Sequence, residues 1–234
     1  MLIDRYAVVS PKAELAEDVE VGPFTIIEEG VIIGRGTKIG ASCYIARGTV
    51  IGEYNRIFHH VVIGTEPQHL SYRGGATSVR IGNRNVIREF VSIHGSYEEG
   101  GCTVIGDDCY IMASSHVGHD CKIGNGIIIT SFVGISGHVV IEDKAVIGGH
   151  VGIHQFVRIG TLTMISGASG VGQDVPPYTM AAGRPAKVYS LNVVGLRRAG
   201  FDEEKRLLLK RVFDAFYRKG MTFSEAIKLS LIHI

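Results

Sequence analysis

A repeat of six residues constrains the fold of this chain more than any other feature. Every sixth residue from Val9 to Val171 is aliphatic except His69, Gly75 and Glu99, and glycine often follows the aliphatic residue. An α-helix repeats about every 3.6 residues and an ordinary strand every two, so neither explains this pattern. An aliphatic residue followed by a small one, once in every six residues, predicts hexapeptide repeats wound into a parallel β-helix.

In such a fold each hexapeptide forms one short side, and three sides close a triangular coil of about eighteen residues. Successive coils stack at a strand spacing of about 4.8 Å, and the aliphatic residues point inward as a ladder. Residues 65–80 and 95–104 interrupt the repeat, yet its phase returns after each interruption. We expect both to be loops that leave a rigid scaffold, and such loops often carry function.

The overall composition excludes several classes of protein. The chain has 234 residues and a formal net charge of +1, which indicates no nucleic-acid partner and no attraction to an anionic membrane. No apolar run is long enough to span a bilayer, and the N-terminal residues lack the apolar core of a signal peptide. Four cysteines without a CxxC pair suggest reduced thiols. We therefore expect a cytoplasmic protein without a membrane span.

Three of the cysteines share one position in the repeat. Cys43, Cys109 and Cys121 each stand two residues before an aliphatic ladder position, where other coils carry small residues such as Thr37 and Ala145. This position should point inward, so we expect the thiols to fill the core. A zinc site built from cysteine and histidine is therefore not expected.

Histidines gather outside the inward positions. His119, Gly137 and Gln155 are spaced by one coil and should stack in a column, with Asp120 and His138 in the next column. Such a cluster is a candidate site, because an imidazole can accept a proton near neutral pH. A neighbouring carboxylate could orient the ring, and the bare N–H of a glycine could stabilise an oxyanion. The imidazoles could instead bind a metal, but no tetrahedral set of ligands is evident, so we expect none.

Four segments carry a family resemblance: HVGHDCKIGNG (116–126), GISGHVVIEDKAVIGGHVGIHQFVRIG (134–160), GASGVGQDVPPY (167–178) and GLRRAGF (195–201). They closely resemble the acyl carrier protein-dependent UDP-N-acetylglucosamine O-acyltransferases that begin lipid A synthesis, over about residues 2 to 228. The resemblance implies a left-handed parallel β-helix, a homotrimer, and active sites between subunits. It also implies transfer of a 3-hydroxyacyl group from the phosphopantetheine thioester of acyl carrier protein to the sugar 3-hydroxyl, without a cofactor.

The resemblance assigns roles to individual residues. His119 matches the general base, Asp120 the residue that orients it, and Gly137 the backbone donor that faces the thioester carbonyl. The remaining matches are His116 and His138, which line the same cleft; His154 and Gln155, which contact the sugar and acyl groups; Gly167, which limits acyl length; and Asn192 and Arg198, which contact the uridine diphosphate.

The sequence departs from the family in the segment EPQHLSYRGG (66–75). His69 and Ser71 stand where the family usually has an Asp and a Lys that touch the glucosamine, and Val194 and Ala199 replace an acid and a basic residue near the nucleotide. The acceptor could therefore be a variant UDP-sugar, such as the 3-amino analogue. Two competing hypotheses are a hexapeptide transferase that uses coenzyme A or another acyl donor, and a non-catalytic β-helix. The His–Asp pair beside an open glycine argues against a non-catalytic protein.

A helical segment follows the repeat. Asp202 can cap a helix that an apolar stripe extends to Gly220, and Ser224 can cap a second one. We therefore predict a β-helix over residues 1–186 and an incomplete helical domain over residues 187–234. The final residues, LSLIHI (229–234), are what a common transposase sequencing adapter would encode. We expect them to be adapter read-through rather than natural sequence.

Overall fold

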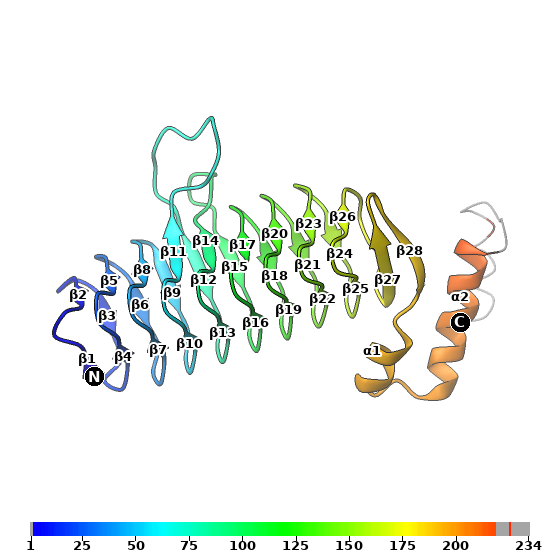
Figure 1. Ribbon diagram of the computed structural model, residues 1–234, viewed down its shortest axis with the longest axis horizontal. Coiled ribbons are helices and arrows are strands. Elements are labelled where there is room, and N and C mark those ends of the chain that lie inside the picture. The colour runs from blue at the N-terminus through cyan, green and yellow to red at the C-terminus, as the bar shows by residue number, and fades with distance from the viewer. Residues whose placement is uncertain (1, 219–224, 226–234) are drawn as a thin grey trace.

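The computed structural model describes residues 2–218 and residue 225, and it confirms the fold expected from the repeat. Short strands lie in three sheets, which form the three sides of a left-handed parallel β-helix (Figure 1). Sheet A contains β1 (Leu2–Ile3), β4 (Glu20–Val21), β7 (Lys38–Ile39), β10 (Arg56–Ile57), β13 (Val86–Ile87), β16 (Tyr110–Ile111), β19 (Ile128–Ile129), β22 (Val146–Ile147), β25 (Met164–Ile165), β27 (Thr179–Gly183) and β28 (Ala186–Leu191). Sheet B contains β2 (Val8–Val9), β5 (Ile26–Ile27), β8 (Tyr44–Ile45), β11 (Val62–Thr65), β14 (Ser92–His94), β17 (His116–Val117), β20 (Gly134–Ile135), β23 (Gly152–Ile153) and β26 (Gly170–Val171). Sheet C contains β3 (Glu14–Leu15), β6 (Ile32–Ile33), β9 (Thr49–Ile51), β12 (Val79–Ile81), β15 (Thr103–Ile105), β18 (Lys122–Ile123), β21 (Val140–Ile141) and β24 (Arg158–Ile159).

A ladder of aliphatic side chains forms the core. Ile87 and Ile111 pair in register between neighbouring coils, and both are fully buried. Cys43, Cys109 and Cys121 are also buried, which confirms that these thiols fill the core. Burial raises the pKa of the Cys109 thiol to about 11 and that of Cys121 to about 12. Both thiols are therefore protonated at neutral pH and are poor nucleophiles.

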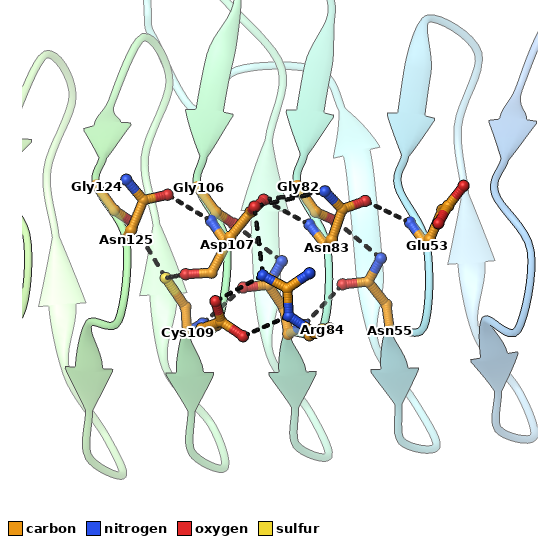
Figure 2. A network of polar contacts seen from close by, with 12 residues as sticks. Glu53, Asn55, Gly82, Asn83, Arg84, Gly106, Asp107, Cys109, Gly124 and Asn125 are labelled. Carbon is orange, nitrogen blue, oxygen red and sulfur yellow. Dashed lines mark hydrogen bonds and ion pairs between the residues drawn. The ribbon is translucent and has the colours of Figure 1, made fainter.

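Side chains fix the edge between sheets C and A through hydrogen bonds to the backbone (Figure 2). The side-chain oxygen of Asn83 accepts from the N–H of Glu53, and that of Asp107 accepts from the N–H of Asn83, both at 2.8 Å. Asn125 continues the series by accepting from the N–H of Asp107 at 2.8 Å. Each bond joins one coil to the next, so the series holds the coils at this edge together.

Two asparagines lie just inside this edge, in the small inward position of the repeat. Asn55 and Asn85 are fully buried (0% exposed), and Figure 2 shows Asn55 below the row of outer side chains. The side chain of Asn85 accepts from the N–H of Cys109 at 2.8 Å and donates to the carbonyl of Gly106 at 2.9 Å. Its buried amide is thus satisfied by the backbone, as buried polar groups generally are.

Both interruptions of the repeat are loops, as expected, and both leave the same edge of the β-helix. The first loop (66–78) connects β11 to β12 and the second loop (95–102) connects β14 to β15, so each runs from sheet B to sheet C. Figure 1 shows the two loops projecting from this edge, which we call the BC edge. Beneath them the aliphatic ladder continues, since Ile63 pairs with Ile93 across the first loop and Ile93 pairs with Val117 across the second. Between β11 and β14 the register shifts after Ile63, where Thr65 pairs with His94.

The last strands and two helices cover the C-terminal end of the β-helix. Strand β28 pairs antiparallel with β27 and continues to Leu191, past the domain boundary predicted at residue 186. Helix α1 (Val193–Arg198) was not predicted, because a helix of this length has little periodic signal. Helix α2 (Glu203–Tyr217) begins after Asp202, as predicted, and the Asp202 carboxylate accepts from the N–H of Lys205 at 2.8 Å.

Two expectations lie outside the described residues: the second helix from Ser224, and the adapter origin of residues 229–234. Among the residues that the structure describes, neither helix is long and apolar enough to cross a membrane. The cytoplasmic location stays a prediction.

Candidate active site

His119 and Asp120 form a hydrogen-bonded pair at the BC edge, in the turn between β17 and β18. Nδ1 of His119 lies 2.8 Å from Oδ2 of Asp120, and the His119 residue is only 7% exposed. A carboxylate accepts hydrogen bonds, so Nδ1 donates in this contact, and Nε2 makes no hydrogen bond to the residues that the structure describes. The contact is compatible with the predicted general base and its orienting residue, and both roles stay predictions.

The second loop surrounds the Asp120 carboxylate. The backbone N–H of Tyr97 donates to Oδ2 of Asp120 at 2.9 Å, and the hydroxyl of Ser96 donates to Oδ1. Burial raises the pKa of Asp120, but the hydrogen bonds from Ser96, His119 and Tyr97 outweigh it and leave this pKa below its usual value. The carboxylate therefore remains charged at neutral pH. Sequence reasoning missed Ser96 and Tyr97, because loop residues have no position in the repeat.

Gly137 lies one coil above His119 and contacts its ring. A Cβ atom at Gly137 would lie 2.5 Å from Cε1 and Nε2 of His119, closer than any side chain tolerates. Only glycine therefore leaves room for the imidazole in this position. The N–H of Gly137 donates no hydrogen bond to any residue that the structure describes. A backbone donor without a partner among the described residues thus lies beside the ring of His119, and its role as an oxyanion donor stays a prediction.

His138 follows Gly137 and completes the rim of the site. Its ring stands perpendicular to that of His119, with 5.1 Å between the ring centroids. On its other side His138 stacks on Phe156 of the next coil, at 4.7 Å. The exposed Gln155 lies at the same edge in the His119 and Gly137 column, and the exposed His154 contacts the carbonyl of Gln155 through Nδ1 at 3.1 Å.

Two further imidazoles lie near His119: His94 is buried, and His116 is partly buried with its ring 5.0 Å from that of His94. Nδ1 of His116 contacts the Ser92 hydroxyl at 3.1 Å, and Nδ1 of His94 donates to the Glu66 carbonyl at 2.8 Å. Burial, with smaller contributions from the neighbouring histidines, lowers the pKa of His116 to about 4, and burial also lowers the pKa of His94. Both rings are therefore neutral near pH 7. Sequence reasoning missed His94, although the second loop begins directly after it.

The first loop reaches the site with His69. Its ring lies perpendicular to that of His119 at 5.4 Å and against Tyr97 at 4.1 Å between ring centroids. The backbone N–H of Ser71 donates to Nδ1 of His69 at 3.2 Å, which holds the ring in place. The two loops therefore meet beside His119. The contact between His69 and His119 places the first loop at the candidate site.

Three predicted site residues lie elsewhere in the chain. Gly167 stands in the turn between β25 and β26, at the edge between sheets A and B. Asn192 is 7% exposed; its side chain caps helix α1 by accepting from the N–H of Gly195 at 2.9 Å and donates to the carbonyl of Leu162 at 2.8 Å. Arg198 is exposed at the end of α1. Within one chain, none of the three contacts the His119 pair.

One group of side chains could in principle hold a metal ion. Among the described residues, His119, Asp120 and His138 offer ligand atoms that all lie within 4.8 Å of one another. However, both oxygens of Asp120 already accept hydrogen bonds from the protein, and a metal at this carboxylate would have to displace some of them. The contacts therefore suit proton transfer better than metal binding, and the absence of a metal stays a prediction.

Comparison with known proteins points to one family. Residues 174–231 match the model for UDP-N-acetylglucosamine O-acyltransferase, domain 2, and residues 12–47 and 102–137 match the bacterial transferase hexapeptide repeat. The acyl-[acyl-carrier-protein]–UDP-N-acetylglucosamine O-acyltransferase of Paraburkholderia phymatum is 49% identical over 221 residues, which are 94% of this chain and 84% of that protein. The enzyme of the same name from Burkholderia orbicola is 46% identical over 173 residues, which are 74% of this chain and 66% of the relative.

Solved structures agree with these matches. The UDP-N-acetylglucosamine acyltransferase of Francisella novicida superimposes with a TM-score of 0.96 at 39% identity and covers 99% of this chain and 86% of that one. The identity, the shared extent and the fold together show that this chain belongs to the acyl-[acyl-carrier-protein]–UDP-N-acetylglucosamine O-acyltransferase family.

Proposed function

We propose that this chain transfers a 3-hydroxyacyl group from acyl carrier protein to the 3-hydroxyl of UDP-N-acetylglucosamine, an early step of lipid A synthesis. The names of its relatives support this donor and this acceptor. The observation that carries the chemistry is the His119–Asp120 pair, whose free Nε2 faces Gly137 with its unpaired backbone N–H. A base and an oxyanion donor side by side are what direct acyl transfer to a hydroxyl needs.

In this mechanism Nε2 of His119 takes the proton of the sugar hydroxyl while its oxygen attacks the thioester carbonyl. The new C–O bond gives a tetrahedral intermediate, and the N–H of Gly137 donates to its oxyanion. The C–S bond then breaks, and the imidazolium returns the proton to the leaving thiolate. Asp120 stabilises the charged imidazole throughout. No covalent acyl-enzyme or cofactor is required, which agrees with the burial of Cys109 and Cys121.

The enzyme should act as a homotrimer, as the resemblance implies. Gly167 stands at the edge between sheets A and B, whereas His119 stands at the BC edge. A site that contains both residues, and also Arg198, therefore needs a second copy of the chain. This separation supports composite sites between subunits, and size measurement by light scattering would contradict the proposal if the chain were monomeric.

The direct test is an assay of the purified chain with 3-hydroxyacyl-acyl carrier protein and a panel of UDP-sugars. His119→Ala should lower turnover by roughly two to four orders of magnitude, because it removes the general base. Asn125→Ala is the control, since Asn125 lies on the edge between sheets C and A, away from both edges that carry the proposed site, and should not change turnover. Near-normal turnover of His119→Ala with its fold intact would contradict the assignment of the base.

A second acceptor class has its own support. The exposed ring of His69 contacts His119 at the position where the resemblance predicts an Asp, and Ser71 replaces the expected Lys. An imidazole and a hydroxyl cannot supply the constant negative and positive charges of that pair. We therefore propose the 3-amino analogue of UDP-N-acetylglucosamine as the alternative acceptor. His69→Asp combined with Ser71→Lys should change the ratio of activities toward the two sugars, and an unchanged ratio would rule out selection by this loop.

A further inference from the structure

We infer that Ser96, in the second loop, is a positioning residue that acts on His119 through Asp120. This inference rests on the proposed acyl transfer. Ser96 is 1% exposed, and its hydroxyl contacts Oδ1 of Asp120, the carboxylate oxygen that His119 does not use. Ser96 and His119 therefore hold different oxygens of the same carboxylate.

The hydroxyl of Ser96 has a single proton and more than one possible acceptor. It lies 2.9 Å from the carbonyl of Glu98, and it accepts from the N–H of Glu98 at 3.0 Å. A charged carboxylate is a stronger acceptor than a neutral carbonyl, so the proton belongs on the bond to Asp120. The N–H of Glu98 then satisfies the Ser96 oxygen and fixes the direction in which the hydroxyl points.

With Ser96 in place, neither oxygen of Asp120 can move freely. Oδ1 is held by Ser96, and Oδ2 is held by the N–H of Tyr97 and by His119. The backbone N–H of Asp120 also donates to the Thr103 hydroxyl at 2.8 Å, which anchors the residue itself. Without Ser96, Oδ1 would lie in a mostly buried position without a donor, and the carboxylate could rotate away from the ring of His119.

A glycine in the second loop leaves space for the contact between Ser96 and Asp120. A Cβ atom at Gly101 would lie 2.2 Å from Oγ of Ser96 and 3.1 Å from Oδ1 of Asp120. Any larger residue at position 101 would therefore push into the hydrogen bond between them. Glycine at this place leaves the room that the Ser96–Asp120 pair occupies, so the loop does more than close the gap between β14 and β15.

The kinetic test is Ser96→Ala, which removes the donor and adds no bulk. A hydrogen bond to a charged group corresponds to roughly a ten- to hundredfold effect, so kcat should fall by that factor while KM for both substrates stays unchanged. Ser115→Ala is the matched control: Ser115 is equally buried, but it donates to the carbonyl of Thr130 and does not touch Asp120. Its kcat should stay within about twofold of wild type.

Two further measurements separate positioning from a general loss of structure. In an Asp120→Asn background, Ser96→Ala should cause no comparable further loss of kcat, because its route to His119 is already broken. In the free enzyme labelled with ¹⁵N-histidine, the proton resonance of His119 Nδ1–H should move or broaden in Ser96→Ala and stay in place in Ser115→Ala.

Each outcome decides the inference. An unchanged kcat in Ser96→Ala, a full independent loss in the Asp120→Asn background, or an unaltered His119 resonance would overturn it. The resonance does not depend on turnover. If the wild-type chain transferred no acyl group, the proposed function would fail, and the resonance would still report whether Ser96 positions the pair.

Discussion

Replacing a buried asparagine of the polar edge should destabilise this fold far more than replacing an exposed one. Asn85→Ala removes the acceptor for the N–H of Cys109 and the donor for the carbonyl of Gly106. The N–H of Cys109 is buried, so its unmade hydrogen bond should cost about 1–3 kcal/mol, whereas the loss at the partly exposed Gly106 should cost about 1 kcal/mol. The free energy of unfolding should therefore fall by about 2–4 kcal/mol, a large share of a typical total.

Asn125→Ala is the matched control, because Asn125 holds a backbone N–H of the neighbouring coil in the same way. Its bond to Asp107 lies on the surface, so water can replace the lost side chain and the cost should stay below about 1 kcal/mol. Guanidinium unfolding of wild type and both variants at one protein concentration would measure the difference from the transition midpoints. Equal losses in the two variants would refute the reasoning that burial sets the cost.

The remaining predictions concern the candidate site. Gly137→Ala should lower kcat by about a hundredfold or more, because its Cβ would displace the ring of His119. Gly172→Ala, where a Cβ meets open space, should not change kcat. Similar activity of the two variants would contradict this explanation. Gly167→Met should shift the preferred donor to a shorter acyl chain, since the longer side chain would take up space at the end of the proposed acyl groove, and its Cβ would already lie 3.2 Å from the Gly149 carbonyl oxygen. An unchanged preference among acyl-acyl carrier proteins would show that Gly167 does not limit chain length. His116 has a pKa of about 4 in the folded chain and 6.5 as its ordinary value, so its contribution to stability is complete above pH 6.5 and is lost as the pH falls toward 4. This loss should amount to about 2 kcal/mol once the partial exposure of the ring is allowed for, and His116→Gln should reduce it in unfolding measurements across this pH range.

The six-residue repeat was enough to place residues that lie on the coils. Because position in the repeat sets both the side of the prism and the inward or outward direction, the stacking of His119 and Gly137 and the burial of Cys121 could be predicted. The same rule could not place the residues of the two loops, because they do not follow the six-residue repeat. His69 and Ser96 reach the His119–Asp120 pair through contacts that only the folded loops create.

At the C-terminal end, one residue that the resemblance assigned to substrate binding also has a structural role. Asn192 was assigned to nucleotide contacts by resemblance, yet an asparagine three residues before Gly195 is also a typical helix cap. The structure uses its side chain for that cap and for a bond to Leu162, while the predicted nucleotide contact stays untested. A short helix such as α1 is stabilised by these few polar contacts, so it could not be predicted from hydrophobic periodicity.

The unbroken ladder beneath the two loops bears on how such enzymes diversify. Ile63 pairs with Ile93 across the first loop and Ile93 pairs with Val117 across the second, so the inward ladder keeps its pairing although the two loops differ in length. For a flexible loop, doubling the number of residues costs only about 0.6 kcal/mol of closure entropy. Substrate preference at the BC edge can therefore evolve by exchange of whole segments, while the coils that hold the base and its glycine neighbour remain as they are.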